Sequence, residues 1–431
     1  MATVQTDIVQ HNPGQPDAFG YSIAFVKATG GQTYSVTQYV AEIDVWESLF
    51  AKAMCCKLGV FDGGGLMETI ALQPGDIIRV TIYADEEGDK LIKDFLISEI
   101  TGGNRTDNSA AKTYNVSGMS RHAYNNMKAN VYRGFSSTYS DMLKKVCSDY
   151  LGLDDVDIES TVGNTTIVSP GKPPFKVIGQ LMTHAVSGRW GPEDSFFFFY
   201  EDRDKVRFKT LKSIVTDAKV HPFIVSVDKN VDGPTDLIKI QHYSQLKAGS
   251  QTERINSGMF ENEIVEVDFL SRTFGSKKFS YEKAGDQLRM LGQGDIVDKA
   301  NNVKDFVNES ASTIRGLSNL VKWRVADESF DREGTMRDKY GTMVAQKALF
   351  NQLIYAVQIF GNPGIKAGDI VDVTSPALSM QGDAPSLDNM FQGRFLVGDV
   401  RHRIVNGEQY LTVLNLFKDG FETANVREES K

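Results

Sequence analysis

The stretch Gly75-Asp76-Ile77-Ile78-Arg79-Val80-Thr81 returns 293 residues later as Gly368-Asp369-Ile370-Val371-Asp372-Val373-Thr374. In each copy a glycine and an aspartate open a run rich in β-branched residues, which predicts a turn followed by a strand. Glycine adopts positive φ without the steric cost that other residues meet. We therefore expect Gly75, Asp76, Gly368 and Asp369 to occupy equivalent turns.

Two further blocks repeat in the same order. Phe95-Leu96-Ile97-Ser98-Glu99-Ile100 returns as Phe395-Leu396-Val397-Gly398-Asp399-Val400, and a third strand-like run follows in each copy, Thr113-Tyr114-Asn115-Val116 and Tyr410-Leu411-Thr412-Val413. A Gly-Asp turn alone is common, but a repeated order of blocks indicates an internal duplication. The sequence therefore predicts one β-module present twice, with Phe95 and Phe395 at equivalent positions.

Length and composition limit the classes of protein. The chain has 431 residues, 41% of them hydrophobic and 24% charged, and a net charge of −9. That length predicts several domains. Tight wrapping of nucleic acid needs many basic side chains on phosphates, and the sequence has no basic block. The composition therefore indicates a globular protein that is not a nucleic-acid binder.

The sequence has few features that indicate a cellular compartment. The N-terminal segment Met1–Asp7 lacks an apolar core, and the chain has no run of 18 apolar residues. We therefore expect neither a secretory signal nor insertion into a membrane. Cys55 and Cys56 are neighbours, so a bond between them would be strained, and together with Cys147 they are expected to be reduced.

Changes in pattern along the chain predict its domains. The fold class is α+β and mainly β, with two β-modules, a small α+β domain and an insertion. The boundaries are an N-terminal arm at 1–18, a first β-module at 19–120, the α+β domain at 121–216, a second β-module at 217–269 and 336–421, an insertion at 270–335 and a C-terminal tail at 422–431.

The α+β domain carries clear local signals. Thr138 with Asp141 predicts a helix cap, apolar residues from Tyr139 to Tyr150 follow at helical spacing, and Gly152 suits the end of the helix. A second helix is expected after Pro173, ending near Gly188. A hairpin of 196–200 and 206–210 follows. Its four successive phenylalanines suit either a surface that stacks ligands or, as we prefer, a strand buried on both faces.

The second β-module is interrupted. Strands are expected at Leu237–Gln241 and Ile264–Asp268, a helix at Tyr340–Leu353 and a strand at Ile354–Phe360. Between them the insertion is polar and has weak helical periodicity around Val297, Val303, Phe306, Ile314, Leu317 and Leu320.

Residues suited to catalysis do not assemble into a motif. The six histidines lack metal-ligand spacing, and no CxxC, HExxH, Gly-x-Ser-x-Gly, Walker or GxGxxG pattern occurs. Gly63-Gly64-Gly65 lacks the Lys-Ser/Thr of a phosphate loop and predicts a turn. The remaining candidates are better explained as loops or structural side chains: Asp154-Asp155, Glu86-Glu87, His184, Trp46, Trp190 and Trp323. We predict no catalytic, cofactor-binding or metal-binding residues.

Taken in order, these segments resemble the central baseplate hub protein of contractile-tailed phages, which is related to the N-terminal hub part of type VI secretion spike proteins. The resemblance covers roughly residues 20–420. It is strongest at 365–371, 393–402 and 409–417, where the second copy of the repeat lies. It implies that the two β-modules are antiparallel β-barrels of tail-tube type.

The resemblance also implies an assembly. A homotrimer would place six barrels in a ring that adapts the six-fold tail tube to the three-fold central spike. Expected partners are the tail spike protein and the tail tube protein, and other baseplate proteins or the tape measure stay open. DNA would be cargo only, passing through a lumen of subunits that each carry −9. The expected location is the phage tail baseplate of the virion, after assembly in the host bacterial cytoplasm.

The sequence departs from the secretion relatives in ending soon after the second β-module, with no oligonucleotide-fold domain or β-helical needle, so a separate spike protein is expected. The insertion is long for a hub, and its partner stays open. Two alternatives remain: a tail-associated enzyme that degrades cell wall, and a hub of a phage-like secretion or bacteriocin apparatus. We prefer the hypothesis of a structural baseplate hub without enzymatic activity to both alternatives.

Overall fold

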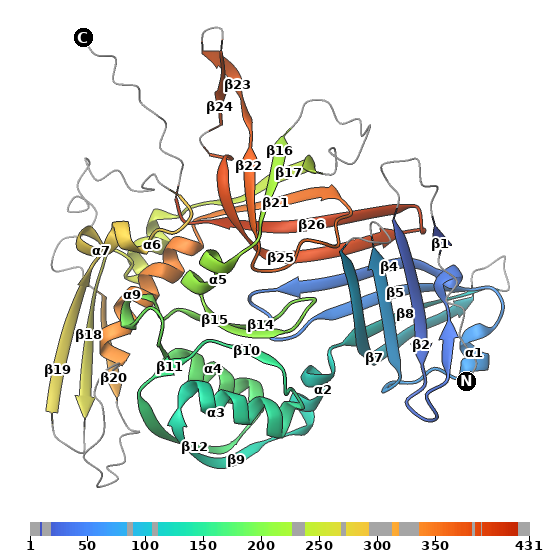
Figure 1. The fold of residues 1–431 in the computed structure, drawn as a ribbon, viewed down its shortest axis with the longest axis horizontal. Helices are drawn as coiled ribbons and strands as arrows, with labels where there is room; N and C mark the ends of the chain where they lie inside the picture. The colour runs from blue at the N-terminus through green and yellow to red at the C-terminus, as the bar shows by residue number, and fades with distance from the viewer. Residues whose placement is uncertain are drawn as a thin grey trace.

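The computed structural model describes residues 9–10, 19–83, 89–105, 111–225, 238–268, 273–292, 313–318, 336–381, 384–388 and 390–420. Several sequence predictions lie outside these residues: nearly all of the arm, the C-terminal tail, and Glu86-Glu87, Leu237, Val297, Val303, Phe306, Leu320 and Trp323. The described chain is mainly β, as predicted, and one continuous fourteen-stranded sheet runs through both β-modules (Figure 1).

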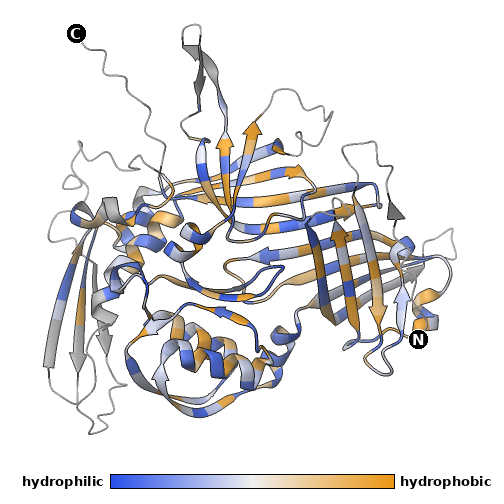
Figure 2. Cartoon of the chain, viewed as in Figure 1, coloured by the Kyte–Doolittle hydropathy of each residue, from blue (hydrophilic) through white to orange (hydrophobic). Residues whose placement is uncertain are grey.

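The first β-module forms an antiparallel sheet curved around a core; we call it the first barrel, although no strand pairing closes it among the described residues. Its strands are β1 (Val9–Gln10), β2 (Gly20–Val26), β3 (Thr33–Ser35), β4 (Val40–Ser48), β5 (Cys55–Asp62), β6 (Ile77–Tyr83), β7 (Lys90–Arg105) and β8 (Lys112–Met119), with the short helices η1 (Thr37–Tyr39) and α1 (Leu66–Ile70). The main strand order is β2-β6-β7-β8-β5-β4. Apolar and polar residues alternate along these strands because successive side chains point to opposite faces (Figure 2).

The second β-module is a closed barrel of six strands. They are β16 (Val220–Val225), β17 (Lys239–Ala248), β21 (Leu353–Phe360), β22 (Ile370–Thr374), β25 (Gly393–Val405) and β26 (Gln409–Lys418). The order β25-β22-β16-β17-β21-β26 closes because β26 also pairs with β25. Strand β16 runs parallel to both β17 and β22, the one departure from antiparallel order. A hairpin of β23 (Pro376–Gln381) and β24 (Ala384–Leu387) leaves the barrel beyond β22 (Figure 1).

Strand registers define which residues of the two modules correspond. Ile77 lies opposite Leu96, and Ile370 lies opposite Leu396. The first two repeat blocks are therefore structurally equivalent. The third block needs a correction of one residue. Val116 lies opposite Ile100 and Leu414 lies opposite Val400, so Val116 corresponds to Leu414.

In Figure 1 most of the α+β domain lies below the second β-module and to the left of the first. Its elements are α2 (Arg121–Lys128), β9 (Val131–Thr138), α3 (Tyr139–Val146), a π-helical turn η2 (Cys147–Leu151), β10 (Val156–Ile158), β11 (Thr161–Val162), β12 (Asn164–Lys172), α4 (Pro174–His184), β13 (Val186–Ser187), η3 (Pro192–Asp194), β14 (Phe197–Glu201), β15 (Val206–Thr210) and α5 (Leu211–Asp217).

The local predictions for this domain are confirmed. The Thr138 side chain accepts a hydrogen bond from the Asp141 N–H, and Gly152 ends the helical segment with φ 69°. Every residue of β14 is buried, so the phenylalanine run is core rather than a stacking surface. Helix α4 ends at His184, four residues before Gly188, because the chain continues into β13.

The insertion differs most from prediction. Strand β18 (Glu261–Asp268) was expected in the second barrel, but it pairs with β19 (Thr273–Ser280) and β20 (Thr313–Ser318) in a separate sheet. Alternation predicts a strand but not its partner, and pairing with the nearby β19 closes a short loop at low entropic cost. The periodicity at Ile314 and Leu317 is also not helical, since both lie in β20. Helices α6 (Gln251–Ser257), α7 (Tyr281–Leu288) and α9 (Met336–Phe350) accompany this sheet.

Candidate functional site: the repeated turns and the seam between the barrels

The two Gly-Asp turns have the same backbone geometry. Gly75 and Gly368 have φ of 98° and 96°, values that favour glycine. The Gly75 N–H donates to the Ile97 carbonyl at 2.9 Å, and the Gly368 N–H donates to the Val397 carbonyl at 2.9 Å. Each turn thus holds the start of one repeat strand, β6 or β22, against the middle of the following repeat strand, β7 or β25.

The aspartate of each turn ties it to the neighbouring strand. The Asp76 carboxylate accepts from the Gln73 N–H at 3.1 Å and from Lys27 Nζ at 2.6 Å. The Asp369 carboxylate accepts from the Lys366 N–H at 3.2 Å and contacts His221 Nε2 at 2.9 Å. Burial alone would raise the pKa of Asp76, but the Lys27 ammonium and the N–H donors hold it below its usual value.

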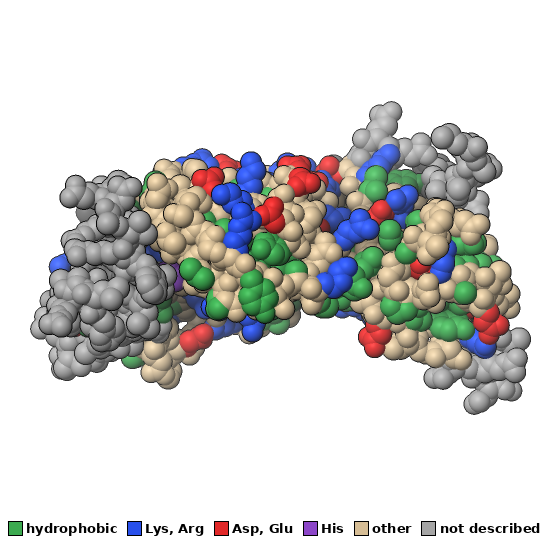
Figure 3. Space-filling view, turned by 90° about the horizontal axis from the view of Figure 1, so that it is seen from below, with side chains coloured by type: hydrophobic (Ala, Val, Ile, Leu, Met, Phe, Trp, Pro, Cys, Tyr) green, Lys and Arg blue, Asp and Glu red, His purple; other side chains and the backbone are tan. Residues whose placement is uncertain are grey.

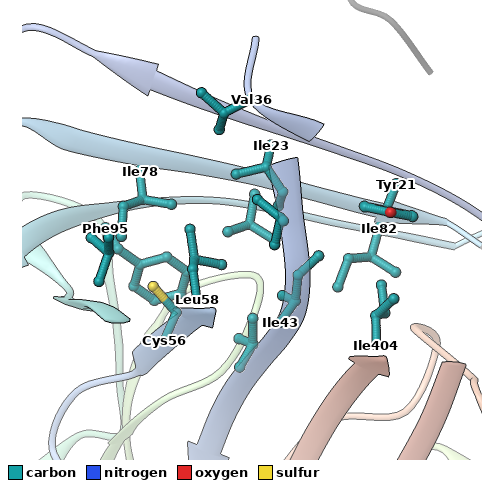
Figure 4. Packing of buried hydrophobic residues seen from close by; sticks show 14 of the residues in the cluster. Tyr21, Ile23, Val36, Ile43, Cys56, Leu58, Ile78, Ile82, Phe95 and Ile404 are labelled. Carbon is teal, nitrogen blue, oxygen red and sulfur yellow. The ribbon is translucent and has the colours of Figure 1, made fainter. Parts of the chain in front are cut away.

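Phe95 and Phe395 lie at the centres of the two barrels. Both side chains are fully buried, and each follows the same pairing, Phe95 opposite Ile78 and Phe395 opposite Val371. Phe95 packs with Cys56, Leu58 and Ile78 in the first core (Figure 4). The six predicted repeat positions therefore form three equivalent pairs rather than one assembled pocket.

A β-bulge follows each phenylalanine, a feature that the sequence analysis missed. The register of β7 shifts between Ile97 and Glu99, and that of β25 shifts between Val397 and Asp399. Beyond the bulge each strand leaves the turn strand of its own module, β6 or β22, and stays paired with the strand on its other edge, β8 or β26. A bulge bends and twists its strand, so each strand then presents a new edge.

In the second barrel this new edge binds the first barrel. Residues 399–405 of β25 pair antiparallel with residues 42–48 of β4, with His402 opposite Val45. We call this pairing the seam. Because β4 also pairs with β5, the seam makes the two barrels one continuous sheet (Figure 1).

Opposite charges cross the seam. Arg401 donates to both carboxylate oxygens of Asp44, at 2.7 and 2.9 Å, and Arg403 bonds Glu42. The acids lie on β4 and the arginines on β25. The arrangement therefore discriminates between strand partners as well as joining them.

Apolar side chains also cross the seam. Ile404 of β25 belongs to the core of the first barrel (Figure 4). Tyr410 of β26 belongs to the same core. The Tyr410 hydroxyl bonds His402 Nδ1 at 2.9 Å. Burial lowers the pKa of His402 to about 3, so this imidazole is neutral at physiological pH.

The hairpin between β14 and β15 joins the α+β domain to both barrels. Glu201 accepts from the Met54 N–H at 2.8 Å and pairs with Lys93 of β7 at 2.9 Å. Burial alone would raise the pKa of Glu201, but the charges of Lys93 and His122 and the hydrogen bonds from Met54 and Ser120 together outweigh burial and lower the pKa. Next in the chain, Asp202 pairs with Arg207 at 2.5 Å and lies 3.8 Å from Lys366 of the second turn.

Buried Glu47 lies beside this hairpin. Its carboxyl accepts from the Ala367 N–H at 3.3 Å, next to the second turn. Burial and the nearby Asp202 carboxylate raise the pKa of Glu47 to about 8. The protonated form is therefore favoured at the junction of the two barrels at neutral pH.

The other sequence candidates lie apart from one another. Gly63-Gly64-Gly65 leads into α1, and Asp62 accepts the N–H groups of Gly64, Leu66 and Met67 that a phosphate would use. Trp46 lies at the seam beneath Arg401, while Trp190 bonds Ser213 in the α+β domain. His184 ends α4, and Asp154-Asp155 lie in the loop before β10.

The remaining chemical features are sparse in the part of the chain that the structure describes. The three cysteines are free, with Cys56 and Cys147 buried and Cys55 exposed. No cluster of three or more His, Cys, Asp or Glu suited to a metal occurs among these residues. None of their helices is both long and apolar enough to cross a bilayer. On the face seen in Figure 3, acidic and basic side chains are interspersed.

The comparisons with known proteins agree with this architecture. No family model matches the sequence. The chain is 24% identical over 297 residues to the probable baseplate hub protein gp334 of Vibrio phage KVP40. The match covers 66% of this chain and 67% of that protein.

A solved phage tail protein shares the fold over nearly the whole chain. The 43 kDa tail protein of prophage MuSo2 from Shewanella oneidensis has a TM-score of 0.53 at 14% identity, over 92% of this chain and 98% of that one. A tail protein from Neisseria meningitidis MC58 has a TM-score of 0.49 at 10% identity, over 93% and 97%. The predicted resemblance is confirmed: this chain is similar to a phage baseplate hub protein in sequence and to a phage tail protein in fold.

Proposed function

We propose that this protein is a structural hub of a contractile phage tail baseplate. Three copies form a ring of six barrels that adapts the six-fold tail tube to the three-fold spike and leaves a channel for DNA. The observation that carries the proposal is the seam, since two equivalent barrels already lie side by side in one chain through a defined strand pairing. The similarity to a probable baseplate hub protein supports the same role.

The proposed partners follow from this geometry. The ring contacts the tail tube protein on one face and the spike protein on the other, and other baseplate proteins or the tape measure add to these contacts. DNA passes through without specific binding, which suits a chain of net charge −9. The protein would assemble in the host cytoplasm and remain in the virion.

Oligomeric state tests the proposal. Light scattering of purified protein at micromolar concentration should give the mass of a trimer, and electron microscopy should show rings with six lobes. A stable monomer with no rings would contradict the proposal.

A cell-wall-degrading enzyme is the second candidate and has less support. A cavity of about 420 Å³ lies between α4, α6 and α9, and Glu253 is the only carboxylate in its lining. Glycoside hydrolysis normally needs two carboxylates across the bond, and Glu253 already pairs with Lys247 at 2.6 Å. Release of soluble fragments from peptidoglycan, lost in Glu253→Gln, would favour the enzyme. A hub of a secretion or bacteriocin apparatus would share the ring and be inert in this assay.

A further inference from the structure

The strand pairing at the seam occurs once within the chain. Strands equivalent to the two seam strands occur elsewhere in the chain, so the same pairing could form a second time. Strand β7 corresponds to β25, since both carry a bulge after the repeat phenylalanine. Strand β4 corresponds to β17 by the same reasoning. A register shift separates Val40 from Glu42 opposite β5, and another separates Ile240 from His242 opposite β21.

This correspondence defines the positions residue by residue. Val45 faces Cys56, and Gln245 faces Tyr355. Cys56 and Tyr355 are equivalent, because their partners on β8 and β26, Gly118 and Leu416, both face the residue that precedes the bulge, Ile97 or Val397. Thus Gln245 occupies in the second barrel the position that Val45 occupies at the seam.

The two strand edges that correspond to the seam have no described strand against them. Strand β7 pairs with β6 only as far as Leu96, and beyond its bulge it pairs only with β8. Strand β17 pairs with β16 at Lys239 and Ile240, and from His242 to Ala248 it pairs only with β21. Open strand edges readily accept another strand.

Exposure supports the correspondence. Ile43 of β4, which faces Ile404 across the seam, is 1% exposed, whereas Tyr243 at the matching position of β17 is 45% exposed. Val45 is fully buried, and its counterpart Gln245 is exposed. On β7, Glu99, Thr101 and Gly102 are exposed, whereas their counterparts on β25 are more covered: Asp399 and Arg401 are half-buried and His402 is buried.

We infer that the edge of β7 beyond Ile97 in one copy pairs antiparallel with the His242–Ala248 edge of β17 in a second copy of this chain, which repeats the seam between subunits. The inference rests on the proposed ring and names the surfaces that close it. The contact is head-to-tail, because each copy offers β7 on its first barrel and β17 on its second. Such contacts form a closed ring when the rotation closes.

The seam register transfers directly. His402 faces Val45, so Gly102 of one copy faces Gln245 of the next. Arg401 faces Trp46. A second register shift in β17, between Gln245 and Lys247, makes Lys247 the counterpart of Trp46 and places its side chain on the opposite face from Gln245, so Thr101 faces Lys247. Strand β7 has its own second shift between Gly102 and Asn104, so the register is transferred only as far as Gly102. Glu99 then lies diagonal to Lys247, in the same sense as Arg401 lies diagonal to Asp44. Opposite charges on that diagonal favour the pairing.

The charges also distinguish this contact from the seam. Positions Glu42 and Asp44 of β4 correspond to His242 and Ser244 of β17. Strand β17 therefore does not offer the carboxylates that Arg401 and Arg403 of β25 bind at the seam. Arginine left without its carboxylate would disfavour pairing of β25 with β17 of another copy.

Disulfide trapping tests the register. In a Cys55→Ser background, Thr101→Cys combined with Lys247→Cys should cross-link under mild oxidation into covalent dimers and trimers on a non-reducing gel. The matched control is Thr101→Cys with Gln245→Cys, whose side chains lie on opposite faces of the proposed sheet and should not cross-link. Equal cross-linking of both pairs would overturn the register.

The same samples separate this inference from the proposed function. A trimer by light scattering that fails to cross-link at Thr101 and Lys247 would overturn the strand pairing and leave the ring intact. A monomer would overturn both.

Charge exchange gives an independent readout. Glu99→Lys and Lys247→Glu should each weaken the trimer up to about five-fold per contact, and the double variant should recover most of that loss. Lys247 also pairs with Glu253 in its own chain, so Glu253→Gln is the control and should leave assembly unchanged. Failure of the double variant to recover assembly would count against the diagonal pair.

Discussion

The two barrels are built from equivalent strands but differ in what covers them. The edge of β4 in the first barrel is covered because it pairs with β25. Its counterpart β17 in the second barrel has an exposed edge from His242 to Gln245. The two strand edges that pair within the chain, those of β25 and β4, carry the ion pair of Arg401 with Asp44 and the apolar Ile404. The difference teaches that equivalent strand edges can have different environments in one chain: the edge of β4 is paired, and the edge of β17 is exposed.

The closure of the barrels differs as well. Strand β16 closes the second barrel by running parallel to both neighbours, while β2 runs antiparallel to β6 in the first. The first barrel instead receives Ile404 and Tyr410 from the second. The first core is therefore completed only when the seam forms.

The largest effect should come from the paired phenylalanines. Phe95→Ala and Phe395→Ala each remove a fully buried ring, and each should lower the free energy of unfolding by about 3–5 kcal/mol. Denaturant titration checks both. Losses that agree within about 1 kcal/mol support equivalence, and a loss below about 1 kcal/mol for one of them would break it.

The turn glycines should separate the two barrels more sharply. Gly75→Val should cost about 1–2 kcal/mol, because its φ of 98° strains any side chain while the space around it is open. At Gly368 a Cβ would also lie 3.0 Å from the Tyr200 hydroxyl, which adds about 1–3 kcal/mol of crowding. Thermal melting and assembly assays check this order. Unchanged melting and assembly in both variants would remove the reason to equate the two turns.

The coupling energies of two ion pairs allow the seam to be compared with the outer surface. A double-mutant cycle on Arg401 and Asp44 should give a coupling of about 1 kcal/mol, since Asp44 is buried and Arg401 is about one-third exposed. The matched control is Arg79 with Asp94, a bidentate cross-strand pair in which both side chains are about half exposed. That pair should give about 0.2–0.5 kcal/mol. Equal couplings would mean that the seam ions act only as surface charges.

The pH response of Glu47 tests the junction between the two barrels. Its raised pKa means that the folded state binds the proton more tightly than the unfolded state. That stabilisation is complete below about pH 4.5 and is lost as pH rises towards about 8. Relative to wild type, Glu47→Gln should therefore become progressively more stable from pH 5 to pH 9. A difference that stays constant across this range would show that Glu47 is not protonated at the junction.

Local structure was largely predictable from local residues. Thr138 with Asp141 marked a helix start, Gly152 marked its end, and the Gly-Asp turns marked strand starts, because each depends on the conformational preferences of a few neighbours. The repeat positions could also be matched from sequence to within one residue.

Partners of strands were not predictable. The run Glu261–Asp268 alternates as a strand should, yet only the fold shows that it leaves the barrel for a separate sheet. The bulges at Ser98 and Gly398 carry no common residue type, so no sequence signal distinguished them. The seam itself joins segments about 350 residues apart, and no local propensity specifies such a pairing.

The sequence by itself determined that one β-module occurs twice and that its turns need glycine, because side-chain alternation and positive φ are properties of the chain within a few residues. Only the tertiary structure decided that β25 binds β4, that Ile404 fills the other barrel, and that β7 and β17 keep exposed edges. The physical reason is that a strand edge offers the same backbone groups to any partner. Burial and charge across long chain separations then select which partner it binds.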